Sequence, residues 1–138
     1  MPGDDTANQL RDVLEGVQGL VSAYFFGSIP EGREHRQSDV DVGVLLDRSV
    51  FPAAEDRFDA RLVLLGLLTR ATGREVDLVV LNDAPPHLAR HIMFSGRPLV
   101  IADAARDRAH RRLVLSRAAD LEPFLRRARA IKLESIAP

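Results

Sequence analysis

The chain has 138 residues, a formal net charge of -1 and no cysteine. This length suits a single domain over residues 1–138, and the near-neutral charge argues against a dedicated nucleic-acid binder, which usually carries a basic excess. The lack of cysteine excludes disulfides and thiolate metal sites. No apolar run approaches the roughly 20 residues that span a bilayer, and the acidic amino terminus does not resemble a signal peptide. We therefore expect a soluble, cytoplasmic domain that does not enter a membrane.

The predicted elements alternate between helices and strands. In chain order they are a helix over 4–18, strands over 20–26 and 39–46, a helix over 52–73, a strand over 75–81, a helix over 87–95, a strand over 99–101 and helical residues over 103–130. Apolar residues at helical spacing predict the helices, and short apolar runs between turn residues predict the strands. Asp4, Asp5 and Thr6 can cap the first helix, and Gly19 stands where it should end. This alternation predicts an α/β or α+β fold.

The last helical stretch contains Pro123. Because proline removes a backbone hydrogen bond inside a helix, we expect a break near Asp120 and a second helix after it. Leu113, Leu121 and Leu125 are the predicted core contacts of this stretch. Apolar residues here that a small sheet cannot cover are expected to form an interface.

A glycine–serine turn and a pair of aspartates form the most informative motif. Gly27 and Ser28 leave the first predicted strand, and Asp39 and Asp41 occupy alternate positions of the second. Because side chains alternate along a strand, the two carboxylates project from one face. Close carboxylates repel one another unless a cation bridges them. Mg²⁺ prefers one or two carboxylates together with water and phosphate oxygens, so the motif predicts a metal-dependent nucleotide site.

A third carboxylate lies in a later apolar strand. Asp77 must reach solvent, a partner or a metal there, because burying a lone charge is costly. Taken alone, Asp39 and Asp41 would read as the solvated face of an edge strand. The Gly-Ser turn upstream and Asp77 downstream favour a metal site instead.

The spacing Gly-Ser-x3-Gly-x5-Ser-Asp-x-Asp, followed by a strand with a single Asp, resembles the nucleotidyltransferase superfamily that includes DNA polymerase beta. It most resembles the minimal nucleotidyltransferase branch, the MNT-type antitoxins that are paired with HEPN-domain toxins. The resemblance extends from the strand before Gly27 to the terminal helices. It implies a small mixed β-sheet flanked by helices.

The resemblance also implies a role for each residue of the motif. Asp39 and Asp41 would ligate two Mg²⁺ ions, and Asp77 would ligate one of them and help to deprotonate the attacking hydroxyl. The residues that would bind the nucleotide are Gly27, Ser28 and, in a supporting role at the start of the strand, Ser38. Glycine lets the backbone approach the phosphates of ATP closely, and the serine hydroxyl can donate to them.

The activity that the resemblance implies is transfer of AMP from ATP to a hydroxyl group. The predicted core uses nearly the whole chain, so the acceptor is expected on another protein. In this family that protein is a HEPN toxin, an RNase that is silenced when its tyrosine is adenylylated. The uncovered apolar residues of the carboxy-terminal helices would then meet the toxin or a second copy of the chain.

Two other functions compete with this interpretation. Glu31 lies in the predicted phosphate loop and does not favour a triphosphate. A non-catalytic antitoxin that neutralises its toxin by binding alone would tolerate that residue. An aminoglycoside-type nucleotidyltransferase would need an acceptor pocket between the carboxy-terminal helices, and their arginine-rich surface suits a cationic drug poorly.

Overall fold

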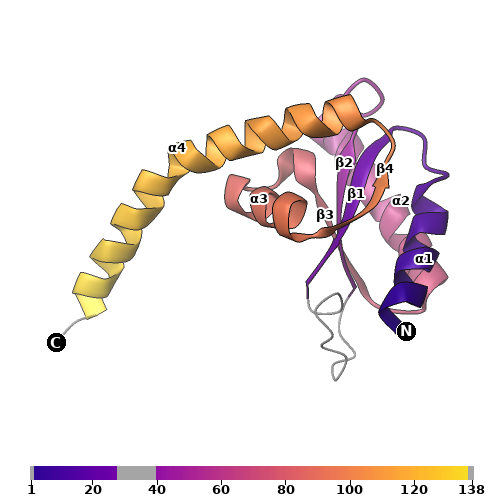
Figure 1. Ribbon diagram of the computed structural model, residues 1–138, viewed down its shortest axis with the longest axis horizontal. Coiled ribbons are helices and arrows are strands. Elements are labelled where there is room, and N and C mark those ends of the chain that lie inside the picture. The colour runs from indigo at the N-terminus through magenta and orange to yellow at the C-terminus, as the bar shows by residue number, and fades with distance from the viewer. Residues whose placement is uncertain (1, 28–39, 137–138) are drawn as a thin grey trace.

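A computed structural model describes residues 2–27 and 40–136 of the chain (Figure 1). Its elements, in chain order, are α1 (Pro2–Leu14), β1 (Leu20–Phe26), β2 (Val40–Leu46), α2 (Ala54–Thr72), β3 (Val76–Val80), the 3-10 helix η1 (Leu81–Asp83), α3 (Pro86–Ser95), β4 (Arg97–Ile101) and α4 (Ala104–Ile136).

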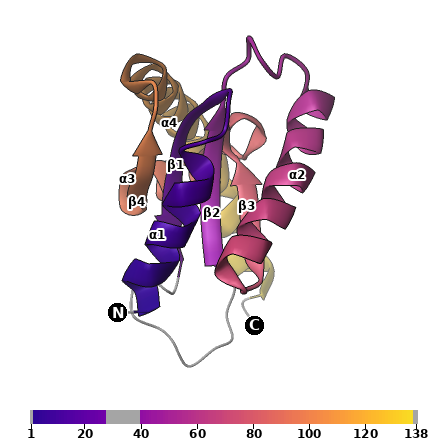
Figure 2. The same cartoon turned by 90° about the vertical axis from the view of Figure 1, so that its right-hand side faces the viewer.

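The strands form one mixed sheet in the order β3-β2-β1-β4. β1 pairs antiparallel with β2 and with β4, whereas β2 and β3 run parallel. Helices α1 and α2 cover one face of the sheet, and α3 and the first part of α4 cover the other (Figures 1 and 2). The predicted small mixed sheet flanked by helices is therefore confirmed.

Side chains alternate along β2, so that its valines face the main core and its aspartate faces the other side of the sheet. Val40, Val42 and Val44 are fully buried in the core beneath α1 and α2. Asp41 and Gly43 occupy the alternate positions, which face the opposite side of the sheet, toward α3. At Gly43 a Cβ atom would lie 2.6 Å from Cγ2 of Ile92 on α3, so only glycine allows α3 to pack this closely.

The first helix differs from its prediction at both ends. It begins at Pro2 and ends at Leu14, so Asp4, Asp5 and Thr6 lie inside it rather than at its cap. Proline fits the first turn of a helix because its missing N–H would have no partner there. Gly19 lies beyond the helix and has a φ of +88°, which is where the chain turns into β1.

The predicted break near Asp120 is wrong, because α4 is a single helix that contains Pro123. Proline frees the carbonyl of the residue four positions earlier and usually bends the helix. Here Ala119 and Pro123 are both exposed, so water can hydrogen-bond the freed carbonyl. Figure 1 shows α4 bending as it leaves the body of the protein. Among the described residues, no helix is long and apolar enough to cross a membrane.

The side of α4 that meets the core also differs from the prediction. Val114 and Ala118 are buried, whereas Leu113 is 39% exposed and Leu121 and Leu125 are partly exposed. Leucines occur around much of this helix, so their spacing alone did not identify the packed side.

A buried polar network attaches α4 to the sheet. The hydroxyl of Tyr24 on β1 donates to Oδ1 of Asp107 at 2.6 Å, and both side chains are buried. Arg111 donates to Oδ2 of Asp107 at 3.1 Å and to the Tyr24 hydroxyl at 3.0 Å. Its guanidinium also lies over the ring of Phe94 on α3, 4.8 Å from the centroid. Burial, and then the bond to Asp107, raises the pKa of Tyr24 to about 12.

Replacing Asp107 by Ala is expected to lower the free energy of unfolding by about 2 kcal/mol, because it leaves a buried hydroxyl without its acceptor. Chemical denaturation would measure the loss. Asp120→Ala, at an exposed position of the same helix, is the matched control and should change stability by less than about 0.5 kcal/mol. Equal stability of the two variants would show that the network does not hold α4 in place.

Candidate active site

Asp41 and Asp77 lie side by side on neighbouring strands. They are Cα partners in the parallel register of β2 and β3, and such strands are about 4.8 Å apart. The residues before and after each aspartate face the core beneath α1 and α2, so both carboxylates project from the opposite face. Asp41 is half-buried and Asp77 is exposed. The strands that carry these two aspartates are thus neighbours in the sheet.

Gly27 lies against the carboxylate of Asp41. It follows β1 directly and has a φ of +92°, a conformation that residues with side chains rarely adopt. A Cβ atom on Gly27 would lie 1.9 Å from Oδ2 of Asp41 and 2.8 Å from its Cγ. Any side chain at this position would therefore displace the carboxylate. The absence of a side chain lets the backbone at Gly27 come within contact of Asp41.

The remaining predicted site residues lie outside the described ranges. They are Ser28, Ser38 and Asp39. In the part of the chain that the structure describes, no three His, Cys, Asp or Glu side chains gather as a metal site. The two carboxylates that are described nevertheless form a donor set that suits Mg²⁺, which commonly takes one or two carboxylates and fills its other positions with water and phosphate oxygens.

The comparison with known families agrees with this geometry. The profile of the family described as Polymerase beta, Nucleotidyltransferase matches residues 8–105, which include β1, β2 and β3 with Gly27, Asp41 and Asp77. The chain belongs to this nucleotidyltransferase family.

Individual relatives narrow the similarity within the family. The chain is 36% identical over 92 residues to protein adenylyltransferase MntA of Shewanella oneidensis, an alignment that covers 65% of this chain and 58% of that relative. It is also similar to a chain from a crystal structure of a toxin–antitoxin with AMP-PNP, with a TM-score of 0.69, 26% identity and coverage of 99% and 100% of the two chains. The predicted resemblance to MNT-type antitoxins is thus confirmed.

A third comparison extends the likeness in fold. A structure of a tri-AMPylated Shewanella oneidensis HEPN toxin in complex with its MNT antitoxin contains a chain that matches with a TM-score of 0.68. That chain shares 23% identity with the present one, and the match covers 98% and 99% of the two chains. Because the identity is this low, the match shows that the two chains share a fold and nothing further.

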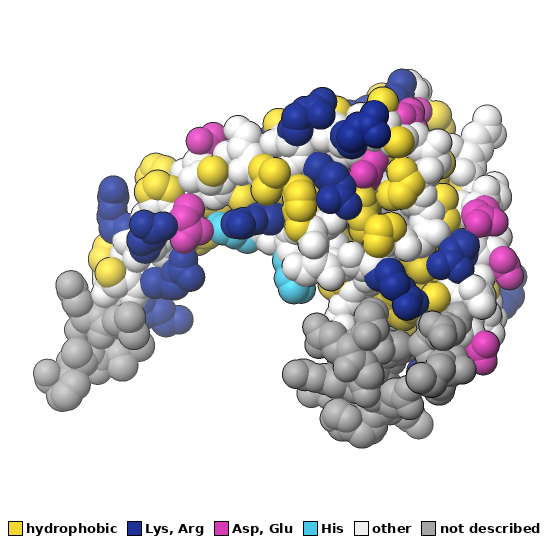
Figure 3. Space-filling model, viewed as in Figure 1, with side chains coloured by type: hydrophobic (Ala, Val, Ile, Leu, Met, Phe, Trp, Pro, Cys, Tyr) yellow, Lys and Arg dark blue, Asp and Glu magenta, His cyan; other side chains and the backbone are white. Residues whose placement is uncertain are grey.

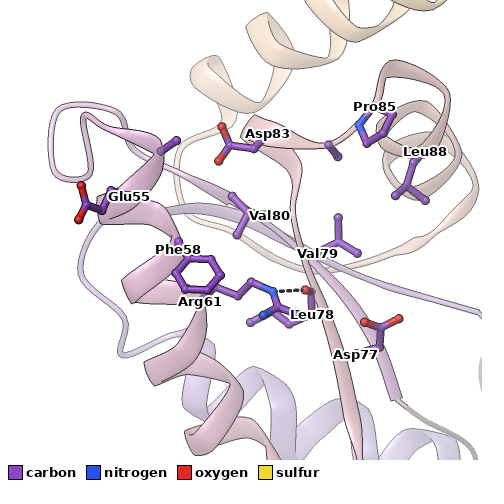
Figure 4. Close-up of a pocket in the computed structure, with 12 residues that line it drawn as sticks. Glu55, Phe58, Arg61, Asp77, Leu78, Val79, Val80, Asp83, Pro85 and Leu88 are labelled. Carbon is purple, nitrogen blue, oxygen red and sulfur yellow. Dashed lines mark hydrogen bonds between the residues drawn. The ribbon is translucent and has the colours of Figure 1, made fainter.

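A groove beside β3, which no sequence pattern indicated, opens onto Asp77. It encloses about 660 Å³ between β3, α2 and α3. Phe58 and Arg61 on α2 line the groove on one side of β3, and Val79 and Asp77 project from β3 on the other side, which faces Leu88 on α3 (Figure 4). Phe58 is a large apolar side chain, yet 56% of it is exposed.

An ion pair between a buried arginine and an exposed aspartate lies at the far end of this groove. Arg57 on α2 is 4% exposed and binds both carboxylate oxygens of Asp83, with distances of 2.8 Å and 2.9 Å. It also donates to the carbonyl oxygens of Phe51 and Pro52. The bond from Arg57 lowers the pKa of Asp83. The negative charge of Asp83 is therefore compensated within the protein, and α2 is attached to the segment after β3.

Proposed function

We propose that this protein transfers AMP from ATP to a tyrosine hydroxyl of a partner HEPN toxin and so acts as its antitoxin. The observation that carries the proposal is the paired Asp41 and Asp77 with Gly27 against Asp41, in a chain 36% identical to protein adenylyltransferase MntA. A structural neighbour in fold comes from a complex that contains an AMPylated HEPN toxin.

The proposed reaction is an in-line displacement at the α-phosphorus of ATP. The hydroxyl oxygen of the acceptor forms a bond to this phosphorus, and the bond from the phosphorus to the oxygen bridging the β-phosphate breaks. Pyrophosphate leaves with that oxygen and its electron pair. The hydroxyl proton passes to the carboxylate of Asp77, whose exposed position on β3 leaves it open to an incoming acceptor.

Asp39, Asp41 and Asp77 are the proposed ligands for two Mg²⁺ ions. When bound, magnesium would supply positive charge that offsets the charge of the phosphates during the displacement. The parallel pairing of β2 and β3 places Asp41 and Asp77 next to one another. Mutual repulsion of the carboxylates makes a cation between them favourable.

Gly27, Ser28 and Ser38 are the proposed contacts to the phosphates of ATP. Gly27 brings the backbone to the carboxylate of Asp41, so phosphates held at this turn would lie beside the metal ligands. The similarity to a toxin–antitoxin structure with AMP-PNP, an analogue of ATP, supports this placement.

The carboxy-terminal part of α4 offers a surface for the partner toxin. Phe124 and Ile131 are 64% and 60% exposed, and α4 extends away from the body of the protein at this end (Figure 1). Lysine and arginine side chains also lie along this helix, which borders a hollow on the face in view (Figure 3). The similarity to toxin–antitoxin complexes favours the toxin over a second copy of the chain as the molecule that covers these residues.

The proposal is tested by incubating the chain and the purified product of its adjacent gene, as the candidate toxin, with Mg²⁺ and α-³²P-labelled ATP. We expect the label to appear on the toxin and the RNase activity of the toxin to fall in parallel. A toxin that stays unlabelled would contradict the proposal.

The second candidate function is that of a non-catalytic antitoxin, because the negative charge of Glu31 in the predicted phosphate loop does not favour a triphosphate. The double variant Asp39→Asn, Asp41→Asn separates the two in cells that express the toxin. Neutralisation by catalysis predicts that the folded double variant no longer protects the cells, whereas neutralisation by binding predicts full protection.

A further inference from the structure

The groove beside β3 presents two large apolar side chains to solvent from opposite walls. Phe58 on α2 is 56% exposed and Leu88 on α3 is 38% exposed, and both line the groove into which Asp77 also projects (Figure 4). An apolar patch with a polar rim is typical of a surface that binds a partner or ligand. The volume of about 660 Å³ lies within the common range of ligand pockets, about 300–1,000 Å³.

From this arrangement, and resting on the AMP transfer proposed above, we infer that the groove binds the segment of the partner toxin that carries the acceptor tyrosine. Gly27 and β1 lie on one side of Asp41, where the phosphates are proposed to bind. Asp77 belongs to the edge strand β3, and the groove opens on its outer side. Acceptor and nucleotide would thus reach the carboxylates from opposite sides, as an in-line displacement requires.

The lining of the groove favours an aromatic acceptor. Val79 and Leu88 lie on the same side of β3 as Asp77 and can bury a tyrosine ring, whereas Phe58, across the edge of β3, would contact residues that flank the tyrosine. The hydroxyl at the end of the ring would then point toward Asp77, which takes its proton as the oxygen bonds to the α-phosphorus and pyrophosphate leaves.

Charge at the rim favours a neutral or basic segment around that tyrosine. Glu55 and Asp77 both line the groove, whereas Asp83 is already paired with Arg57. Arg61 contributes a positive charge, but its Nε donates to the carbonyl oxygen of Leu78 at 2.8 Å. That bond also occupies the edge of β3 where an added strand would pair. The segment is therefore recognised mainly through its side chains.

Replacing Phe58 by Ala tests this assignment. We expect kcat/KM for the toxin to fall about tenfold, as for a central aromatic contact of an interface, while the KM for ATP changes less than twofold. Because Phe58 is largely exposed, the variant should fold normally. Leu67→Ala, which removes a 42% exposed side chain from the same helix outside the groove lining, is the matched control and should keep the wild-type kcat/KM. Equal values for the two variants would overturn the assignment.

Crosslinking locates the bound segment directly. With the photoreactive amino acid p-benzoylphenylalanine in place of Phe58, irradiation of the complex with the toxin should yield a crosslink to the peptide that contains the acceptor tyrosine. The same probe in place of Leu67 should not yield that crosslink. If the wild-type chain transfers AMP but the probe at Phe58 captures another peptide or none, the groove assignment is wrong. If the wild-type chain transfers no AMP, the proposed function itself fails.

Discussion

Replacing Asp41 by Asn is expected to lower the rate of AMP transfer by about a thousandfold, the factor that corresponds to roughly 4 kcal/mol of lost transition-state stabilisation. Asparagine keeps the shape of the side chain but removes the negative charge of this proposed magnesium ligand. Asp41 projects away from the main core and toward Gly27, so the variant should fold. The rate of label transfer from ATP to the toxin, measured in a single turnover, reports the effect.

Asp59→Asn is the matched control for this variant. It makes the same chemical change at an exposed position of α2, and we expect it to transfer AMP at the wild-type rate. Asp77→Asn should lose activity to a similar degree, because it removes a proposed metal ligand and the proposed acceptor of the hydroxyl proton. Full activity of the folded Asp41→Asn variant would refute the assignment of the site.

Replacing Gly27 by Ala is expected to lower AMP transfer by about a hundredfold or more, because an error of about 1 Å in a catalytic group can cost that much. The added Cβ would lie 1.9 Å from Oδ2 of Asp41, so the carboxylate or the backbone at position 27 must move. The positive φ of Gly27 adds about 1–2 kcal/mol of backbone strain for alanine. Single-turnover transfer and thermal unfolding together separate these two effects.

Gly66→Ala is the control for the substitution at Gly27. Gly66 lies within α2, and a Cβ atom there would meet nothing within 4 Å. Alanine favours the helix at this position by about 1 kcal/mol, so the control should be fully active and as stable as the wild type or more so. If Gly27→Ala were equally active, the close contact between Gly27 and Asp41 would have no catalytic importance.

The strands were the most predictable part of this fold. Each of the four predicted strands overlaps an observed one, and β1 was predicted with its exact bounds, because its apolar run Leu20–Phe26 lies between two glycines. Gly73 ends α2 in the left-handed conformation, with a φ of 64°, as expected of a glycine that caps a helix. Such signals are local, so the sequence alone reveals them.

Packing around the helices was less predictable, because it depends on contacts distant in sequence. In α2, Leu64 and Leu68 are buried, whereas Phe58 and Leu62 are exposed. Apolar residues surround this helix, so their periodicity does not identify the side that meets the sheet. For the same reason the sequence pattern could not indicate that Phe58 lines a groove beside β3 rather than the core.

The candidate site was predicted in part. Asp41 and Asp77 could be paired because each interrupts an apolar strand. The contact of Gly27 with Asp41 follows from the register of β1 on β2, in which Phe26 and Asp41 are partners. No sequence pattern specifies that register. The ion pair of Arg57 with Asp83 was not predicted, because the two residues are 26 positions apart in the sequence and belong to different elements.

The most direct test of the central claim is intact-mass spectrometry of the toxin after incubation with this chain, ATP and Mg²⁺. The account predicts that the toxin gains one or more AMP masses with the wild-type chain and none with Asp41→Asn, although both chains bind the toxin. An unchanged toxin mass with the wild-type chain, in a stable complex, would contradict AMP transfer and favour an antitoxin that acts by binding alone.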